Sequence, residues 1–226
     1  MEHMAESWAQ FLMRYYLQLK PGRLPKGFSW LHPQQEPAVQ QTMALFFDKY
    51  FNDTQPRLLM LGINPGRFGA GVTGVNFTAP KQLTHPCNIP HPFGSQTELS
   101  AEFIYDMIAA YGEPELFYNQ VFIGSVCPLG FVKGGKNINY YDDKTLLAAV
   151  SPFIINSMQQ LANCNIDRRR CVCIGGEKNY KHLNQWNEQH QWFDTIIPVP
   201  HPRFIMQYRR KEKHQFIDAY LHALIL

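Results

Sequence analysis

RLLMLGINPGRFGAGVTGVNF, residues 57–77, joins a short apolar run to a glycine-rich segment. The run at 57–63 is shorter than most helices, and turn residues follow it at once. Such a run is typical of a strand that is buried on both faces of a parallel sheet. This stretch therefore predicts an α/β fold, in which helices cover both faces of a sheet.

Similar apolar runs recur along the chain, separated by stretches with helical spacing. Further strands are expected at 119–126, 169–176 and 193–200. Helices are expected at 5–19, after Pro37, and at 98–111, 144–162, 177–189 and 209–223. Because strands alternate with helices, we expect a three-layer α/β/α fold around a central, mainly parallel four-stranded sheet.

Three segments that suit ligand binding follow strands directly. They are NPGRFG at 64–69, CPLGF at 127–131 and HPRF at 201–204. Ligands of open α/β sheets bind beyond the carboxyl ends of the strands. The long irregular stretch from 64 to 96 is dense in Gly and Pro, and such loops are often functional. The sequence thus locates a site at this edge of the sheet before any chemistry is assigned.

Composition sets the broad class of the protein. The chain has 226 residues, 45% apolar and 17% charged, with a net charge of +3. These values fit one globular domain over 1–226, with 1–52 as an N-terminal helical segment packed on it. The sequence has no secretory signal, no apolar run long enough for a membrane span, and five Cys that we interpret as small buried residues. We therefore expect a cytoplasmic monomer without a membrane partner.

The glycine-rich segment has the features of a ligand-binding loop. Asn64 stands at the end of a strand, and its amide both donates and accepts hydrogen bonds, which suits holding a water. Four glycines allow the backbone to approach a ligand closely: Gly66, Gly69, Gly71 and Gly74. The lysine of a Walker loop and the GxGxxG spacing of a dinucleotide site are both missing. Asn64-Pro65-Gly66 is also an ordinary turn sequence, and that alternative stays open.

The segment VPHPRFIMQYRRKEKH, residues 199–214, places His201 between two prolines. An apolar triplet follows, Phe204, Ile205 and Met206, and five cations flank it: Arg203, Arg209, Arg210, Lys211 and Lys213. An apolar wedge rimmed by cations suits a protein that unstacks a base step and holds phosphates. The mild global charge therefore conceals a basic patch. A structural loop histidine and a solvated first turn of the last helix are the alternatives.

These segments together resemble the single-strand-selective monofunctional uracil-DNA glycosylases. The first motif of that family reads approximately GMNPGPFGMAQTGVPFG, and this chain has GINPGRFGAGVTGVNFT at 62–78. The second family motif begins HPSPRN, where this chain has HPRFIM at 201–206. An NLCPL element of the family corresponds to SVCPL at 125–129. The resemblance covers roughly residues 57–215 and implies the glycosylase fold.

The resemblance implies hydrolysis of the N-glycosidic bond of uracil, or of 5-substituted uracil, in DNA, leaving an abasic site. Asn64 would position the attacking water, and His201 would stabilise charge on the leaving base. Substrate contacts are implied for Gly62, Ile63, Gly66, Phe68, Phe77 and Ser125. DNA contacts are implied for Arg203, Phe204, Ile205, Met206, Arg209, Arg210 and Lys211. DNA is the expected partner, and no cofactor or metal is expected.

Departures from the family motifs leave other functions open. Ser125 stands where the family has an Asn that reads the base, and a hydroxyl reads one edge group less selectively than an amide. Asp142 and Asp143 are interpreted as a helix N-cap and not as a catalytic pair. The alternatives are a nucleic-acid binding module that has lost activity and a nucleotide hydrolase. His85, Cys87 and His91 have the residue types of a metal site, but prolines separate them.

Overall fold

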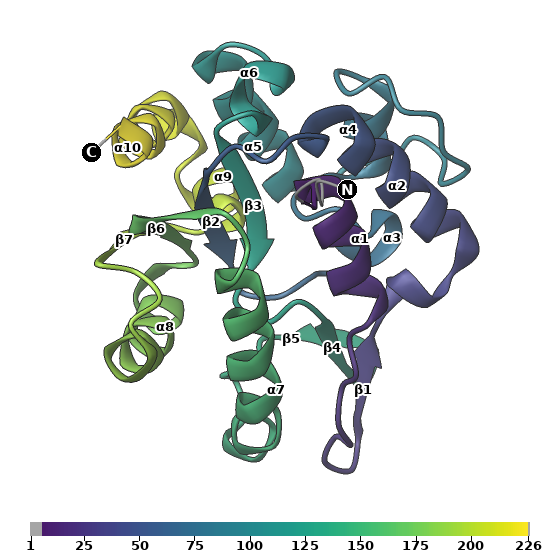
Figure 1. The fold of residues 1–226 in the computed structure, drawn as a ribbon, viewed down its shortest axis with the longest axis vertical. Coiled ribbons are helices and arrows are strands. Elements are labelled where there is room, and N and C mark those ends of the chain that lie inside the picture. Colours follow the sequence, from purple (N-terminus) through teal and green to yellow (C-terminus); the bar gives the residue numbers. More distant parts are fainter. Residues whose placement is uncertain (1–5, 226) are drawn as a thin grey trace, which may run out of the picture.

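Four parallel strands form the centre of the fold in this computed structural model, which describes residues 6–225 (Figure 1). They lie in the order β3-β2-β6-β7. Their bounds are β2 Arg57–Gly62, β3 Val121–Ser125, β6 Ile166–Ile174 and β7 Thr195–Val199. Every residue of β2 and β3 is buried, so both faces of the sheet are covered there. The predicted α/β fold with a parallel four-stranded sheet is confirmed.

The helices lie close to their predicted positions. The longer ones are α1 Trp8–Leu17, α2 Pro37–Phe51, α5 Leu99–Tyr111, α7 Lys144–Ala162, α8 Gly176–His190 and α10 Lys213–Ile225. The predicted first helix began at residue 5, which lies outside the described residues. Asp143 caps α7 by accepting hydrogen bonds from the amides of Thr145 and Leu146, as predicted. Short helices interrupt the loops: α3 Ala70–Thr73, α4 Pro80–Thr84, α6 Pro114–Tyr118 and α9 Pro202–Tyr208.

A second, antiparallel sheet was not predicted. It consists of β1 Phe28–Leu31, β4 Gly130–Lys133 and β5 Lys136–Ile138, in the order β1-β4-β5. Gly134 and Gly135 join β4 to β5 with φ angles of 55° and 73°, the left-handed pair that a tight hairpin turn requires. The segment expected to be a plain loop after β3 is therefore a hairpin, and its far end returns to the carboxyl edge of the central sheet.

Aromatic packing joins the N-terminal helices to the sheet. Trp8 of α1 and Phe51 of α2 both contact Phe122 of β3, with ring centroids 5.7 Å apart in each pair. Arg57, fully buried at the start of β2, pairs with Asp53 at 2.7 Å and donates to the carbonyl of Tyr118. A buried guanidinium is tolerated only when it is paired. These contacts of Arg57 therefore hold the amino end of β2 in place.

The cysteines are buried largely as predicted. Cys87, Cys127, Cys171 and Cys173 are buried as expected, whereas Cys164 is half-buried. In residues 6–225, no helix combines the length and the apolar character needed to cross a membrane.

Candidate active site

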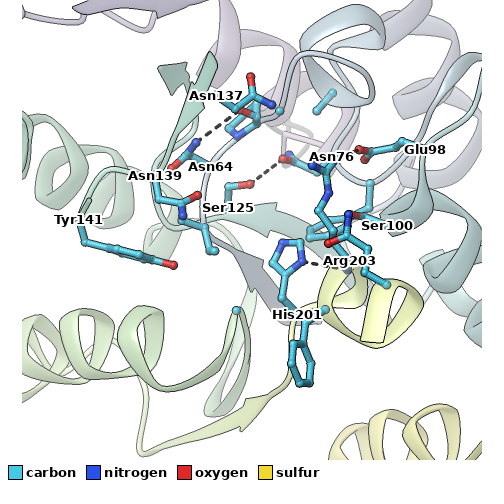
Figure 2. Close-up of a pocket in the computed structure, with 18 of the residues that line it drawn as sticks. Asn64, Asn76, Glu98, Ser100, Ser125, Asn137, Asn139, Tyr141, His201 and Arg203 are labelled. Carbon is cyan, nitrogen blue, oxygen red and sulfur yellow. Dashed lines mark hydrogen bonds and ion pairs between the residues drawn. The ribbon is translucent and has the colours of Figure 1, made fainter. Parts of the chain in front are cut away.

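A pocket of about 450 Å³ opens at the carboxyl edge of the central sheet. The loops after β2, β3 and β7 meet there, as the sequence predicted (Figure 2). Eight of the predicted site residues line it: Ile63, Asn64, Gly66, Phe77, Ser125, His201, Arg203 and Phe204. Seven others do not: Gly62, Phe68, Ile205, Met206, Arg209, Arg210 and Lys211.

Asn64 follows β2 directly, and its side-chain amide is held at both ends. Its Nδ2 donates to the carbonyl of Ile138 at 3.2 Å, and its Oδ1 accepts from the amide of Tyr140 at 3.0 Å. Asn64 thereby ties the end of the unpredicted hairpin to the pocket. A carbonyl oxygen has two acceptor positions, so Oδ1 keeps one for a water.

His201 is the N-cap of α9, and its ring faces the pocket (Figure 2). The backbone amide of Arg203 donates to Nδ1 at 3.1 Å. Burial of the ring, together with the nearby Arg203 cation, lowers the pKa of His201 to about 4. The imidazole is therefore neutral at pH 7. Because Nδ1 accepts a hydrogen bond, the ring proton is assigned to Nε2, which becomes a donor.

Phe77 forms an aromatic wall of the pocket, with its ring centroid 6.1 Å from that of His201. Its φ of 54° is unusual for a bulky residue, and such strain concentrates at functional sites. Gly62 lies behind the ring: a Cβ there would come within 2.7 Å of Phe77 Cε2. Gly62 therefore supports the aromatic wall and does not contact the cavity, which corrects the expected substrate contact.

Asn76 lines the pocket and was missed in the sequence. Ser125 Oγ donates to its Oδ1 at 2.7 Å, and its Nδ2 donates to the hydroxyl of Tyr16 at 2.9 Å. Asn76 and Ser125 are each 6% exposed. In the quoted motif, the family has Pro at this position, and that exchange was the signal that could have identified Asn76.

The hairpin adds two further residues that were missed, Asn137 and Asn139. The Oδ1 of Asn137 accepts from the amide of Arg67 at 3.3 Å. Asn139 lines the same pocket as Asn64 and Tyr141 (Figure 2). Together with Asn64 and Asn76, these residues line the pocket with four neutral amides. Asn137 and Asn139 were not predicted because this segment was expected to be a plain loop.

The apolar triplet after His201 is divided by α9. Ile205 and Met206 are 0% and 4% exposed, so they belong to the core and cannot contact DNA in this conformation. Their predicted role is wrong, because the helix turns them towards the protein. Phe204, 45% exposed, stays at the pocket mouth, and Tyr208 lies one turn further with its ring 5.7 Å away. Phe68 is 53% exposed and lies outside the pocket, contrary to expectation.

Acidic residues partly neutralise the predicted basic patch. Arg203 pairs with Glu98 at 3.3 Å, Arg210 with Glu102 at 3.8 Å and Lys213 with Asp106 at 2.8 Å. These three acids recur every four residues at the start and along one side of α5. Arg209 pairs with Glu212 at 3.4 Å. Four of the five cations of the patch are therefore held in ion pairs at the surface.

The residues with metal-ligand chemistry in the loop after β2 make other contacts. The Nε2 of His91 bonds the hydroxyl of Thr84, and the Cys87 thiol bonds the hydroxyl of Tyr105. Within residues 6–225, no group of three or more His, Cys, Asp or Glu side chains is arranged to hold a metal ion.

Comparisons with known proteins agree with this geometry. A family model described as the uracil DNA glycosylase superfamily matches residues 49–225. The chain is similar to the crystal structure of wild-type SMUG2 from Pedobacter heparinus, at 40% identity and a TM-score of 0.93. That match covers 97% of each chain. A comparison with curated proteins gave no match. This chain therefore belongs to the uracil DNA glycosylase superfamily, and its resemblance to the single-strand-selective branch is confirmed.

Proposed function

We propose that this protein is a monofunctional DNA glycosylase that hydrolyses the N-glycosidic bond of uracil in DNA. The observation that carries the proposal is the pocket itself: a neutral His201, a clamped Asn64 and the ring of Phe77 face one cavity of about 450 Å³. Membership of the superfamily supports the same reaction class. The product is an abasic site, the starting point of base excision repair, and the protein acts as a cytoplasmic monomer.

The base must leave the helical stack to reach this cavity, because the bond that breaks is inaccessible inside a duplex. Phe77 offers an aromatic face for the flipped base, and such stacking contributes about 1–3 kcal/mol per base. Phe204, exposed at the mouth, fills the vacated stack. Gly66 places no side chain in the cavity wall, which leaves room for a small substituent on the pyrimidine, such as hydroxymethyl.

His201 stabilises the charge that develops on the base. The glycosidic bond breaks with its electron pair moving to the base, while the sugar acquires oxocarbenium character. The neutral imidazole donates from Nε2 towards uracil O2. A donor that is already oriented contributes about 3–4 kcal/mol to such a step. Because the Arg203 amide donates to Nδ1, the ring proton stays on Nε2, the nitrogen that donates to the base.

Asn64 positions the water that adds to the sugar carbon. Both ends of its amide are bound to the hairpin, so the free acceptor position of Oδ1 has a fixed direction. An amide is a weak base, and its contribution is therefore orientation. As the bond from the water to the sugar forms, the proton of the water passes through solvent to the departing uracil anion, so that the products are neutral uracil and an abasic sugar. Since the uracil anion is a good leaving group, protonation by a carboxylic acid is not required.

Glu98 is the one carboxylate among the residues that line the cavity in the described part of the chain. Burial raises its pKa, while the Arg203 cation acts in the opposite direction. Its side chain packs against Gly69 and pairs with Arg203. We therefore assign it to the placement of Arg203 and not to proton transfer. The pocket has no lysine among its described lining residues, and we expect no strand cleavage by a Schiff base.

The test is release of base from labelled oligonucleotides that carry one uracil, in single and double strands. Uracil should be released and an abasic site left, with strand scission only after alkali treatment. Parallel substrates with 5-hydroxymethyluracil, xanthine and hypoxanthine define the base range. Salt-dependent DNA binding without any base release would support the non-catalytic alternative and contradict the proposal.

A further inference from the structure

We propose that Asn76 reads the Watson–Crick edge of the flipped base, and that Ser125 and Tyr16 position its amide. This inference rests on the proposed function, because it names the residue that selects the base in the same pocket. It starts from the observation that Asn76 and Ser125, from separate segments, form a hydrogen-bonded pair in the cavity wall (Figure 2).

The hydrogen bonds of the Asn76 side chain leave part of its amide free. An amide has two N–H donors and two acceptor positions on oxygen. Among residues 6–225, Tyr16 takes one donor and Ser125 occupies one acceptor position. One N–H and one acceptor position therefore remain on the same planar group.

The burial of Asn76 makes its unpaired N–H and its free acceptor position significant. Asn76 is only 6% exposed, yet it belongs to the lining of the cavity. A buried polar atom without a partner is costly, so unused donors and acceptors in a pocket wall indicate a ligand with matching groups. Tyr16 is itself buried and stacks on Phe47 with a centroid distance of 6.0 Å, which holds the hydroxyl in place.

The backbone around Asn76 is also fixed. The Thr73 hydroxyl donates to the carbonyl of Thr78 at 2.6 Å and accepts from the amide of Val75 at 3.1 Å. The Thr78 hydroxyl donates to the carbonyl of Asn76 at 3.2 Å. The same short segment carries the aromatic wall at Phe77, so the base-stacking ring and the free amide are held by one set of hydrogen bonds.

Other polar groups of the pocket are less suited to this task. Asn64 uses its amide to hold the hairpin, and Asn137 is exposed and accepts from the Arg67 amide. Ser125 donates its proton to Asn76, so its hydroxyl has no donor left for the base. Ser125 is thus a positioning residue, and its place in the wall is compatible with an amide that comes from residue 76.

The free donor and acceptor specify a class of base. Uracil presents an N–H beside a carbonyl on its Watson–Crick edge, and 6-oxopurines do the same. A carboxamide pairs with such a lactam through two hydrogen bonds, one in each direction. A methyl group on N3 of uracil removes the donor and prevents this pairing. Asn76 should therefore favour lactam-containing bases over N3-methylated uracil.

The experiment compares single-stranded oligonucleotides that carry either uracil or N3-methyluracil. Wild-type protein should release uracil at least about tenfold faster, since one lost hydrogen bond costs roughly that factor in rate. The selectivity ratio is the release rate of uracil divided by that of N3-methyluracil. Asn76→Ala should lower uracil release by about tenfold or more and bring this ratio closer to one. Tyr16→Phe should narrow it less, and Tyr50→Phe, another buried tyrosine of the same core, should leave it unchanged.

An exchange variant separates reading from folding. Asn76→Ser alone removes the amide, whereas Asn76→Ser combined with Ser125→Asn restores an amide to the same pair from strand β3. The double variant should regain part of the ratio that the single variant loses. All variants are checked for an unchanged thermal unfolding midpoint. An unchanged ratio in Asn76→Ala, with the fold intact and the wild type active, overturns the inference.

Binding distinguishes this failure from failure of the proposed function. The same oligonucleotides are made with a 2′-fluoro substituent, which slows cleavage by destabilising positive charge on the sugar. Their dissociation constants are then measured with wild-type and Asn76→Ala protein. If the wild type releases no base but still prefers the uracil oligonucleotide through Asn76, the catalytic proposal fails and the reading role stands. Equal binding of both oligonucleotides by wild-type protein overturns the reading role.

Discussion

The cavity and the helical segment beside it differ in the charge of the side chains that they present. The cavity wall is mainly neutral: amides of Asn64 and Asn76 and an uncharged His201, each fixed by a further hydrogen bond. The neighbouring segment from Arg203 to Lys213 is charged and half-exposed, and ion pairs with α5 balance it. Fixed neutral dipoles suit a reaction that creates charge in a closed site, whereas exchangeable ion pairs suit a DNA backbone.

Removing a cavity residue should therefore have the largest effect. His201→Ala should lower the rate of uracil release by about 10²–10³-fold, because an oriented donor to the leaving base is lost. Asn64→Ala should have a comparable effect, since it removes both the water position and the clamp on the hairpin. Single-turnover assays measure the rates, with exposed His222→Ala as control. Unchanged rates in both cavity variants would refute the assigned roles.

The helix α9 divides its residues between the two regions, and two alanine variants expose the division. Ile205→Ala should destabilise the fold by about 2–4 kcal/mol, because a fully buried side chain leaves a cavity. Phe204→Ala should leave the fold intact but weaken binding to uracil-containing duplex by about tenfold, the lower range of a lost stacking contact. Urea denaturation and duplex binding are measured on both. A reversed pattern, with Ile205 affecting only binding, would restore the wedge first predicted for it.

Much of the fold and part of the candidate site were predictable from the sequence, because strands and helices leave periodic patterns of apolar residues. The apolar run before Asn64 and the three later runs fixed the sheet, because buried parallel strands and their helices leave strong patterns. The motif positions of Asn64, Phe77 and His201 then placed three cavity residues. A short helix is a weaker pattern: PRFIMQY has no spacing that separates Phe204 from Ile205 before the helix axis is known.

The missed features depend on contacts between distant segments. The acids of α5 are spaced for one side of a helix, but their pairing with Arg203 and Lys213 spans more than 100 positions in the chain. Asn76 shows its role only through Ser125 and Tyr16, which are 49 and 60 positions away. The hairpin of Gly134 and Gly135 is different, because its two glycines between short β-forming runs were a local signal.

The neutral state of His201 should appear in the stability of the fold. Its pKa is about 4 in the folded protein, against an ordinary histidine pKa of about 6.5. The unfolded chain therefore takes up a proton as pH falls through 6.5, while the folded protein does not. The stability from this residue is complete only well above pH 6.5, and it falls by up to about 3 kcal/mol as the pH drops from there towards 4.

Urea denaturation at pH 7.5 and 4.5 measures this loss, and His201→Gln serves as the comparison because its side chain does not titrate. Glu98, whose pKa is raised by burial, acts in the opposite direction in both proteins and cancels in the difference. The wild type should lose more stability than the variant between the two pH values. An equal loss would mean that His201 is protonated in the folded protein near pH 6.5, and its assignment as a neutral donor would fail.

The smallest expected effect concerns the ion pairs, and it tests whether they restrain DNA binding. Glu102→Gln with Asp106→Asn frees Arg210 and Lys213 from their partners. Two additional phosphate contacts would steepen the dependence of log K on log salt by about 1.4 for single-stranded DNA. Affinity at low salt should rise by a few fold. Lys211→Ala should act in the opposite direction, with a slope shallower by about 0.7 if Lys211 contacts one phosphate.

Fluorescence anisotropy over a salt series measures both slopes, with Asp218→Asn on the exposed side of α10 as control for a simple change in net charge. If this control steepens the slope as much as the double variant, the effect is global charge and not the release of particular cations. A slope that the double variant leaves unchanged would place the DNA backbone away from α5 and α10. The charged segment would then stabilise the placement of α9 and His201, and its ion pairs would have a structural role without contributing to DNA binding.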